Sequence, residues 1–120
     1  MNLKEYEDFV VKMVCDRSKR DFESKILTGG LGCGGEGGEI ADLAKKVVFH
    51  GMEFDEEARK KLIKEIGDNL FYLAWTAREV CGIGLQEAID ANVDKLNKRY
   101  QNGTFTHAEF MAKEKAQNAN

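Results

Sequence analysis

Two pairs of acidic residues share one spacing and are the first candidates for chemistry. Glu36 and Glu39 lie three positions apart in a glycine-rich stretch, and Glu65 and Asp68 repeat that separation farther along the chain. Residues three apart on an α-helix share one face. Four carboxylates in one partly buried place repel one another unless cations neutralise them or their pKa values rise. Carboxylate oxygens are hard ligands, so the pattern favours a divalent cation such as Mg²⁺ or Mn²⁺.

Either acidic pair alone is more typical of a helix surface that faces water. Two pairs beside apolar positions such as Leu43 and Leu62 strengthen the case for a metal site, and a solvated surface stays open as an equal alternative. A di-iron centre is disfavoured, because neither His50 nor His107 has a glutamate three positions before it.

The glycines at residues 30–35 formally match the GxGxxG pattern of dinucleotide-binding turns. The context argues against that function, because no strand pattern precedes the glycines and the glutamates that follow would repel a pyrophosphate. A Walker loop is excluded as well, since no Gly-Lys-Ser or Gly-Lys-Thr sequence follows.

Polar and aromatic residues later in the chain are candidates for contacts to a ligand. Asn92, Lys95 and Arg99 are spaced to lie on one helix face, where the basic groups can bind phosphate and the amide can orient a sugar or a metal-bound water. Taken alone, that spacing is more simply explained by a polar stripe facing solvent. Tyr72 lies one turn after Asp68, where it can stack or hydrogen-bond near a metal, or pack in the core.

Four helices are expected to position these groups. Apolar residues recur at helical spacing over about residues 2–14, 36–50, 55–81 and 85–100. Asn2 and Asp55 are suited to cap two of these helices, and Gly51 is suited to stop another. The charged residues 16–25 are expected to face solvent. Gly37 and Gly38 would each cost the second helix about 1 kcal/mol relative to alanine, which indicates that another group approaches closely there.

The length and composition predict one globular all-α domain. The chain has 120 residues, of which 42% are apolar and 32% are charged. The very apolar third helix favours a four-helix bundle-type subunit whose core is completed by oligomerisation. We expect residues 1–105 to form the domain and residues 106–120 to form a polar tail that is either an arm or frayed.

Composition also limits the partners. The net charge of -3 gives no basic footprint for nucleic acid, and the longest apolar run, residues 70–75, is far below the roughly 20 residues of a membrane span. The N-terminus lacks the regions of a signal peptide, so a cytoplasmic protein is expected. Cys15, Cys33 and Cys81 are an odd, widely spaced set, which fits reduced thiols and small buried side chains.

The chain resembles the MazG-like members of the all-α nucleoside triphosphate pyrophosphohydrolases. The resemblance rests on residues 35–46, 65–74, 82–88 and 92–100, which follow the family's order. It implies helical subunits that form homodimers or homotetramers. It also implies Mg²⁺-dependent hydrolysis of a (deoxy)nucleoside triphosphate to the monophosphate and pyrophosphate.

The resemblance further implies roles for single residues. The metal ligands would be Glu36, Glu39, Glu65 and Asp68, with Glu36 or Glu39 as the general base for the attacking water. The contacts to the nucleotide would come from Tyr72, Asn92, Lys95 and Arg99. Two non-catalytic functions stay open: a helical nucleotide-binding sensor and a dimerisation module of the same fold.

Overall fold

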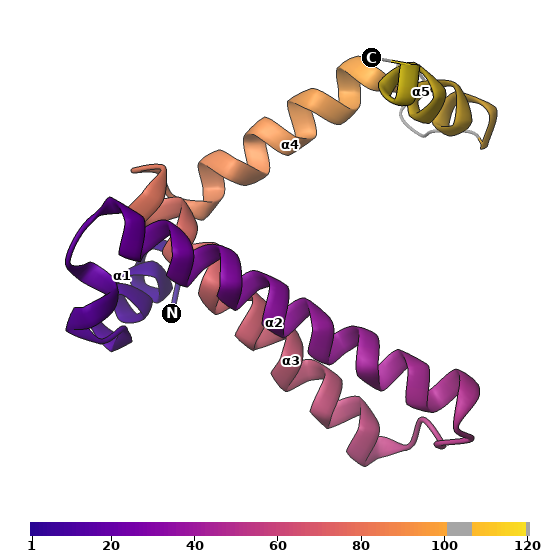
Figure 1. The fold of residues 1–120 in the computed structure, drawn as a ribbon, viewed down its shortest axis with the longest axis horizontal. Helices are drawn as coiled ribbons and strands as arrows, with labels where there is room; N and C mark the ends of the chain where they lie inside the picture. Colours follow the sequence, from indigo (N-terminus) through magenta and orange to yellow (C-terminus); the bar gives the residue numbers. More distant parts are fainter. Residues whose placement is uncertain (101–106, 120) are drawn as a thin grey trace. The chain divides into compact units, whose positions relative to one another are not determined.

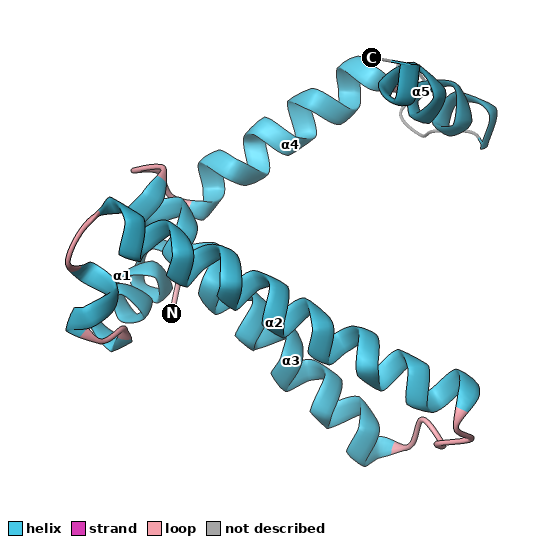
Figure 2. Cartoon of the chain, in the orientation of Figure 1, coloured by secondary structure: helices cyan, strands magenta, loops and turns pink. Residues whose placement is uncertain are grey.

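The structure is a computed structural model that describes residues 1–100 and 107–119, and its regular elements are helices (Figure 1). The helices are α1 (Leu3–Met13), α2 (Phe22–Phe49), α3 (Glu56–Trp75), α4 (Leu85–Arg99) and α5 (His107–Ala119). A 3₁₀ turn at Asp16–Lys19 precedes α2, and a π-helical turn at Thr76–Val80 continues α3. The described residues contain no strand, which confirms the all-α prediction (Figure 2).

Contacts divide the chain into two compact units, Met1–Gln86 and Glu87–Asn120. The first unit contains α1, α2 and α3. Within it, α2 and α3 run side by side as a hairpin joined by residues 50–55 (Figure 1). The second unit contains most of α4 together with α5, which lies in the segment expected to be an arm or frayed. The predicted domain boundary at residue 105 stays a prediction.

The predicted helix caps and stops are confirmed. Asn2 Oδ1 accepts a hydrogen bond from the Glu5 backbone N–H at 2.8 Å, and Asp55 Oδ1 accepts one from the Ala58 N–H at 2.9 Å. Gly51 has a φ of 69°, in the left-handed region that favours glycine after a helix. Gly82, with a φ of 68°, stands in the turn before α4.

The predicted start of the second helix is wrong. The helix α2 begins at Phe22, after Asp21 accepts a hydrogen bond from the Ser24 N–H at 2.7 Å, and it continues through the whole glycine-rich stretch. Glu36 and Glu39 therefore lie in the middle of a 28-residue helix rather than in its first turn. The charged residues 16–25 form the 3₁₀ turn and the first turn of α2.

Two glycines of α2 allow α3 and its π-helical extension to come close. A Cβ added at Gly29 would overlap Thr76 Oγ1, and one added at Gly32 would overlap the ring of Tyr72. The predicted close approach at Gly37 and Gly38 is wrong for this chain by itself, because no atom would lie within 4 Å of a Cβ added at either position. The contacts near Gly29 and Gly32 help to offset the helix-weakening effect of the glycines.

The core of the first unit lies where α1, α3 and the start of α4 meet. Its buried members are Val10, Ala74, Trp75, Ala77 and Leu85. The indole of Trp75 is fully buried, and its Nε1–H donates to the Lys25 carbonyl of α2 at 3.0 Å. Trp75 is thus a core residue that also ties α3 to α2.

One carboxylate is buried in this core. Glu7 of α1 is only 4% exposed, and its Oε2 accepts a hydrogen bond at 3.1 Å from the backbone N–H of Leu85, the first residue of α4. A negative group at this place satisfies a free N–H and interacts favourably with the helix dipole. Glu7 therefore caps α4 from a different helix.

Large apolar side chains remain exposed on the hairpin, including Leu31 at 73%, Val48 at 70% and Phe49 at 80%. Completion of the core by oligomerisation stays a prediction. Among the described residues, no helix has the length and apolar character needed to cross a membrane. The cysteines are free thiols as predicted, but they are not buried: Cys15 and Cys81 are exposed and Cys33 is half-buried.

Candidate functional site

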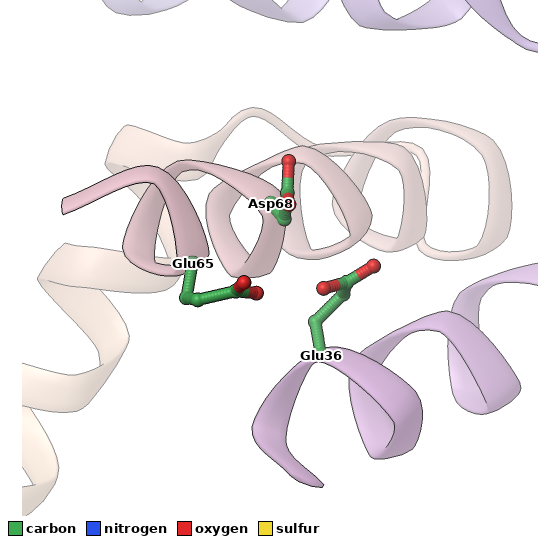
Figure 3. A group of neighbouring side chains, drawn as sticks. All are labelled: Glu36, Glu65 and Asp68. Atoms are coloured by element: carbon green, nitrogen blue, oxygen red, sulfur yellow. The ribbon is translucent and has the colours of Figure 1, made fainter. Parts of the chain in front are cut away.

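An acidic cluster lies between the two long helices. Glu36 of α2 and Glu65 and Asp68 of α3 each offer a carboxylate oxygen, and these three atoms lie within 4.8 Å of one another. Figure 3 shows Glu36 extending from α2 towards the two acidic side chains of α3. The cluster thus brings together one member of the first predicted pair and both members of the second.

The cluster forms through the spacing of residues within α3 and the packing of α2 against α3. Glu65 and Asp68 project from one side of α3 because they are three residues apart. Glu36 joins them because the hairpin places the middle of α2 beside the middle of α3 (Figure 1). The cluster therefore depends on the alignment of α2 along α3.

The electrostatics of the cluster are unfavourable for three ionised carboxylates. Burial raises the pKa of Glu36 above its usual value, and repulsion from Asp68, Glu65 and Glu39 raises it further. The ion pairs found among the described residues include none of the three clustered carboxylates. A bound cation would supply the missing positive charge.

The donor set fits a hard divalent cation. Mg²⁺ binds oxygen ligands at about 2.0–2.1 Å, so two ligands of one ion lie at most about 4.2 Å apart. Oxygens within 4.8 Å need only small side-chain rotations to reach that arrangement. Three carboxylates still leave room for water and phosphate oxygens, which Mg²⁺ usually retains in nucleotide sites.

Glu39 lies outside the group of three. It is exposed, one turn after Glu36 on α2, and close enough for its charge to raise the pKa of Glu36. Glu36 and Glu39, which were both predicted as ligands with either one as the general base, therefore occupy different places. One belongs to the cluster and the other stands beside it.

Tyr72 lies at the contact between the two helices. It is half-buried, its ring covers Gly32 of α2, and it meets Phe71 edge-on with ring centroids 5.3 Å apart. This position fits the packing interpretation of Tyr72, and its contact to a nucleotide stays a prediction.

Asn92, Lys95 and Arg99 lie on α4, as the spacing predicts. Asn92 and Lys95 are exposed, and Arg99 is partly exposed. All three belong to the second compact unit, whereas the acidic cluster belongs to the first. Phosphate binding by Lys95 and Arg99 and the orientation of a sugar or a water by Asn92 stay predictions.

Two residues at the site were not singled out from the sequence. The Asn69 side-chain amide donates hydrogen bonds to the backbone carbonyls of Glu36 and Glu65, at 3.1 Å and 2.7 Å. The Tyr6 hydroxyl of α1 donates to the Gly67 carbonyl at 3.4 Å, and the pKa of its phenol is raised by burial and then by the charge of Asp68. The position of Asn69 four residues after Glu65 was an available signal.

An all-helical chain with an acidic cluster between paired helices has the architecture expected for an all-α nucleotide pyrophosphohydrolase. The family model of the MazG nucleotide pyrophosphohydrolase domain matches residues 31–104, and this segment contains the whole cluster and Glu39. Because the match covers more than half of the chain, the chain belongs to the MazG family. No curated protein and no solved structure matches the chain significantly.

Proposed function

We propose that this protein is a Mg²⁺-dependent pyrophosphohydrolase that converts a (deoxy)nucleoside triphosphate to the monophosphate and pyrophosphate. The observation that carries the proposal is the cluster of Glu36, Glu65 and Asp68 inside the MazG domain. Mn²⁺ is a suitable substitute, because it takes the same oxygen ligands.

The three clustered carboxylates would hold the metal. A bound Mg²⁺ would neutralise phosphate charge and stabilise the leaving pyrophosphate. Glu36, Glu65 and Asp68 would fix the place of the triphosphate through that ion. The raised pKa of Glu36 means that its charged form is disfavoured in the cluster, so a neighbouring positive charge would stabilise that form.

Glu39 is the general base in this proposal, because it stands beside the cluster and is free of the ligand role given to Glu36. Its carboxylate would take a proton from the attacking water as the water oxygen bonds to phosphorus. The bond between the attacked phosphorus and the oxygen bridging the α- and β-phosphates then breaks, and the leaving phosphate group keeps that oxygen and the electron pair, which separates the monophosphate from pyrophosphate.

The remaining groups would bind the substrate and complete the subunit. Lys95 and Arg99 would hold phosphate oxygens, Asn92 would orient the sugar or a water, and Tyr72 would contact the nucleotide. The exposed apolar residues of α2 and α3 support a homodimer or homotetramer. The free thiols support a cytoplasmic protein.

A nucleotide panel tests the proposal. Purified protein is incubated with canonical and modified (deoxy)nucleoside triphosphates and Mg²⁺, and pyrophosphate release is measured. Glu36→Gln should abolish most of the release, whereas Glu53→Gln, which changes an exposed glutamate in the loop between α2 and α3, should not.

Absence of pyrophosphate above the Glu36→Gln background for every nucleotide would refute hydrolysis. Thermal stabilisation by nucleotide and Mg²⁺ without product would then identify a sensor, and no effect of either ligand would identify a dimerisation module.

A further inference from the structure

Asn69 makes two hydrogen bonds in the first unit that the proposed function does not explain. Its Nδ2 group has two protons, and each is directed to a backbone carbonyl: that of Glu65, one turn earlier on α3, and that of Glu36, across the interface on α2. A single side chain is thus bound to the two backbone positions that carry opposing carboxylates.

This contact opposes the repulsion within the cluster. Glu36, Glu65 and Asp68 tend to push α2 and α3 apart when they are ionised. Asn69 is partly buried, and hydrogen bonds in such a place hold their groups more firmly than exposed ones. A link at the level of the cluster limits the separation of the carboxylates there.

Two other close contacts lie on the side of the cluster away from the loop at residues 50–55. Tyr72 against Gly32 and Thr76 against Gly29 set the approach of the two helices, but they involve no backbone group of a clustered residue. Asn69 is different, because one of its partners is the backbone carbonyl of Glu36 itself.

We propose that Asn69 is a positioning residue that holds Glu36 of α2 at a fixed place against the Glu65 turn of α3, so that the three carboxylates are spaced for a small divalent cation. The proposal rests on the metal-dependent function given above. Asn69 acts through the ligands and does not touch the ion or the substrate.

The size of the cation gives a readout that separates positioning from general stability. Mg²⁺ demands nearly ideal octahedral geometry at about 2.0–2.1 Å, whereas Ca²⁺ accepts flexible geometry at about 2.3–2.6 Å. A loosened cluster should therefore lose affinity for Mg²⁺ more than for Ca²⁺. A uniform loss of stability would weaken both alike.

The experiment measures Mn²⁺ binding to the full chain by electron paramagnetic resonance without nucleotide, and then displaces Mn²⁺ with Mg²⁺ or Ca²⁺. Asn69→Leu removes both donors at similar size, and Asn69→Ala provides a second variant that suits a helix. We expect Mg²⁺ affinity to fall about 10- to 100-fold, as for other residues that orient metal ligands, and Ca²⁺ affinity to fall by a clearly smaller factor.

Thr76→Val is the matched control. It removes another hydrogen bond from a side chain to the backbone, the 2.7 Å bond from Thr76 Oγ1 to the Tyr72 carbonyl of α3, at a residue that packs against Gly29 of α2 but lies away from the cluster. Both metal affinities should be unchanged.

Unchanged Mg²⁺ affinity in a folded Asn69 variant, or equal losses for Mg²⁺ and Ca²⁺, would overturn the role of Asn69. That result would leave the proposed function intact wherever the unmodified chain still releases pyrophosphate. Selective loss of Mg²⁺ affinity in a chain that hydrolyses no nucleotide would instead retain the role of Asn69 at the metal site and refute the activity.

Discussion

The two halves of the glycine-rich stretch in α2 differ in what surrounds them. In the first half, Gly29 and Gly32 lie directly against Thr76 and Tyr72, where a larger side chain would collide, although Gly30 between them faces open space. In the second half, Gly34, Gly37 and Gly38 have no atom within 4 Å of the place a Cβ would take. One residue type therefore serves helix packing in the first half and leaves open space around the acidic residues in the second.

This difference indicates that the two halves of the stretch have different roles. The first half fixes α2 against α3, and the open second half presents Glu36 and Glu39. Substitutions in the first half should change stability before activity, and those in the second half should do the reverse.

The largest effect is expected from Glu39→Gln in the open half. Loss of a general base should lower kcat about 10²- to 10⁴-fold, while the fold should change little because a charge leaves an acidic region. Pyrophosphate release and thermal unfolding should be measured together, with Glu53→Gln as the control. Full turnover by Glu39→Gln would assign the proton transfer to another group.

A smaller loss, in stability, is expected from Gly32→Ala in the packed half. The new methyl group would collide with the ring of Tyr72. Overpacking costs about 1–3 kcal/mol, and the gain in helix propensity returns about 1 kcal/mol, so a net loss of up to about 2 kcal/mol is expected. Urea unfolding monitored by circular dichroism measures it, and an unchanged midpoint would mean that Tyr72 moves away freely.

The matched substitution in the open half should raise stability rather than lower it. Gly34→Ala places a methyl group where no atom lies within 4 Å, so the free energy of unfolding should rise by about 1 kcal/mol or less. The same urea experiment applies. Destabilisation by Gly34→Ala would show that this face is covered in solution, and would weaken the contrast between the two halves.

The smallest expected effect is the contribution of Glu36 to the pH dependence of folding stability. Its pKa is raised in the folded chain, so folded protein binds this proton more tightly than unfolded protein, and stability from Glu36 is lost as pH rises through that pKa. The pKa values of Asp8, Asp21 and Asp42 are lowered in the folded chain, so the stability that these residues contribute is lost as pH falls. The comparison must therefore be made with Glu36→Gln.

Metal-free unmodified protein should lose stability relative to Glu36→Gln as the pH is raised across the carboxyl range. Chemical unfolding at several pH values measures that difference, and Mg²⁺ should reduce it. A difference with the reverse sign would show that Glu36 is stabilised in its charged form.

Local chemistry was enough to predict much of the fold. The caps at Asn2 and Asp55 and the stop at Gly51 depend on neighbours within a few residues, and all three were found where they were expected. The start of α2 was not predicted, because the contacts of Gly29 and Gly32 come from Thr76 and Tyr72, 47 and 40 positions later in the chain.

The candidate site shows the same limit. Helix spacing placed Glu65 and Asp68 on one side of α3, and they lie together in the cluster. Helix spacing could not tell whether Glu36 or Glu39 would join the cluster, because that depends on how α2 is rotated towards α3. The hydrogen bond from Asn69 to the Glu36 carbonyl could likewise be predicted only once the positions of both helices were known.

The cap that Glu7 gives to α4 has a consequence for the order in which the chain folds. Its partner, the Leu85 N–H, is 78 positions away in sequence, so α1 leaves the ribosome long before this contact can form. Closing so long a loop is entropically costly, and the contact forms only when the intervening hairpin has brought the ends together. The first and last segments of this unit are therefore expected to become protected from hydrogen exchange together, as one late cooperative step.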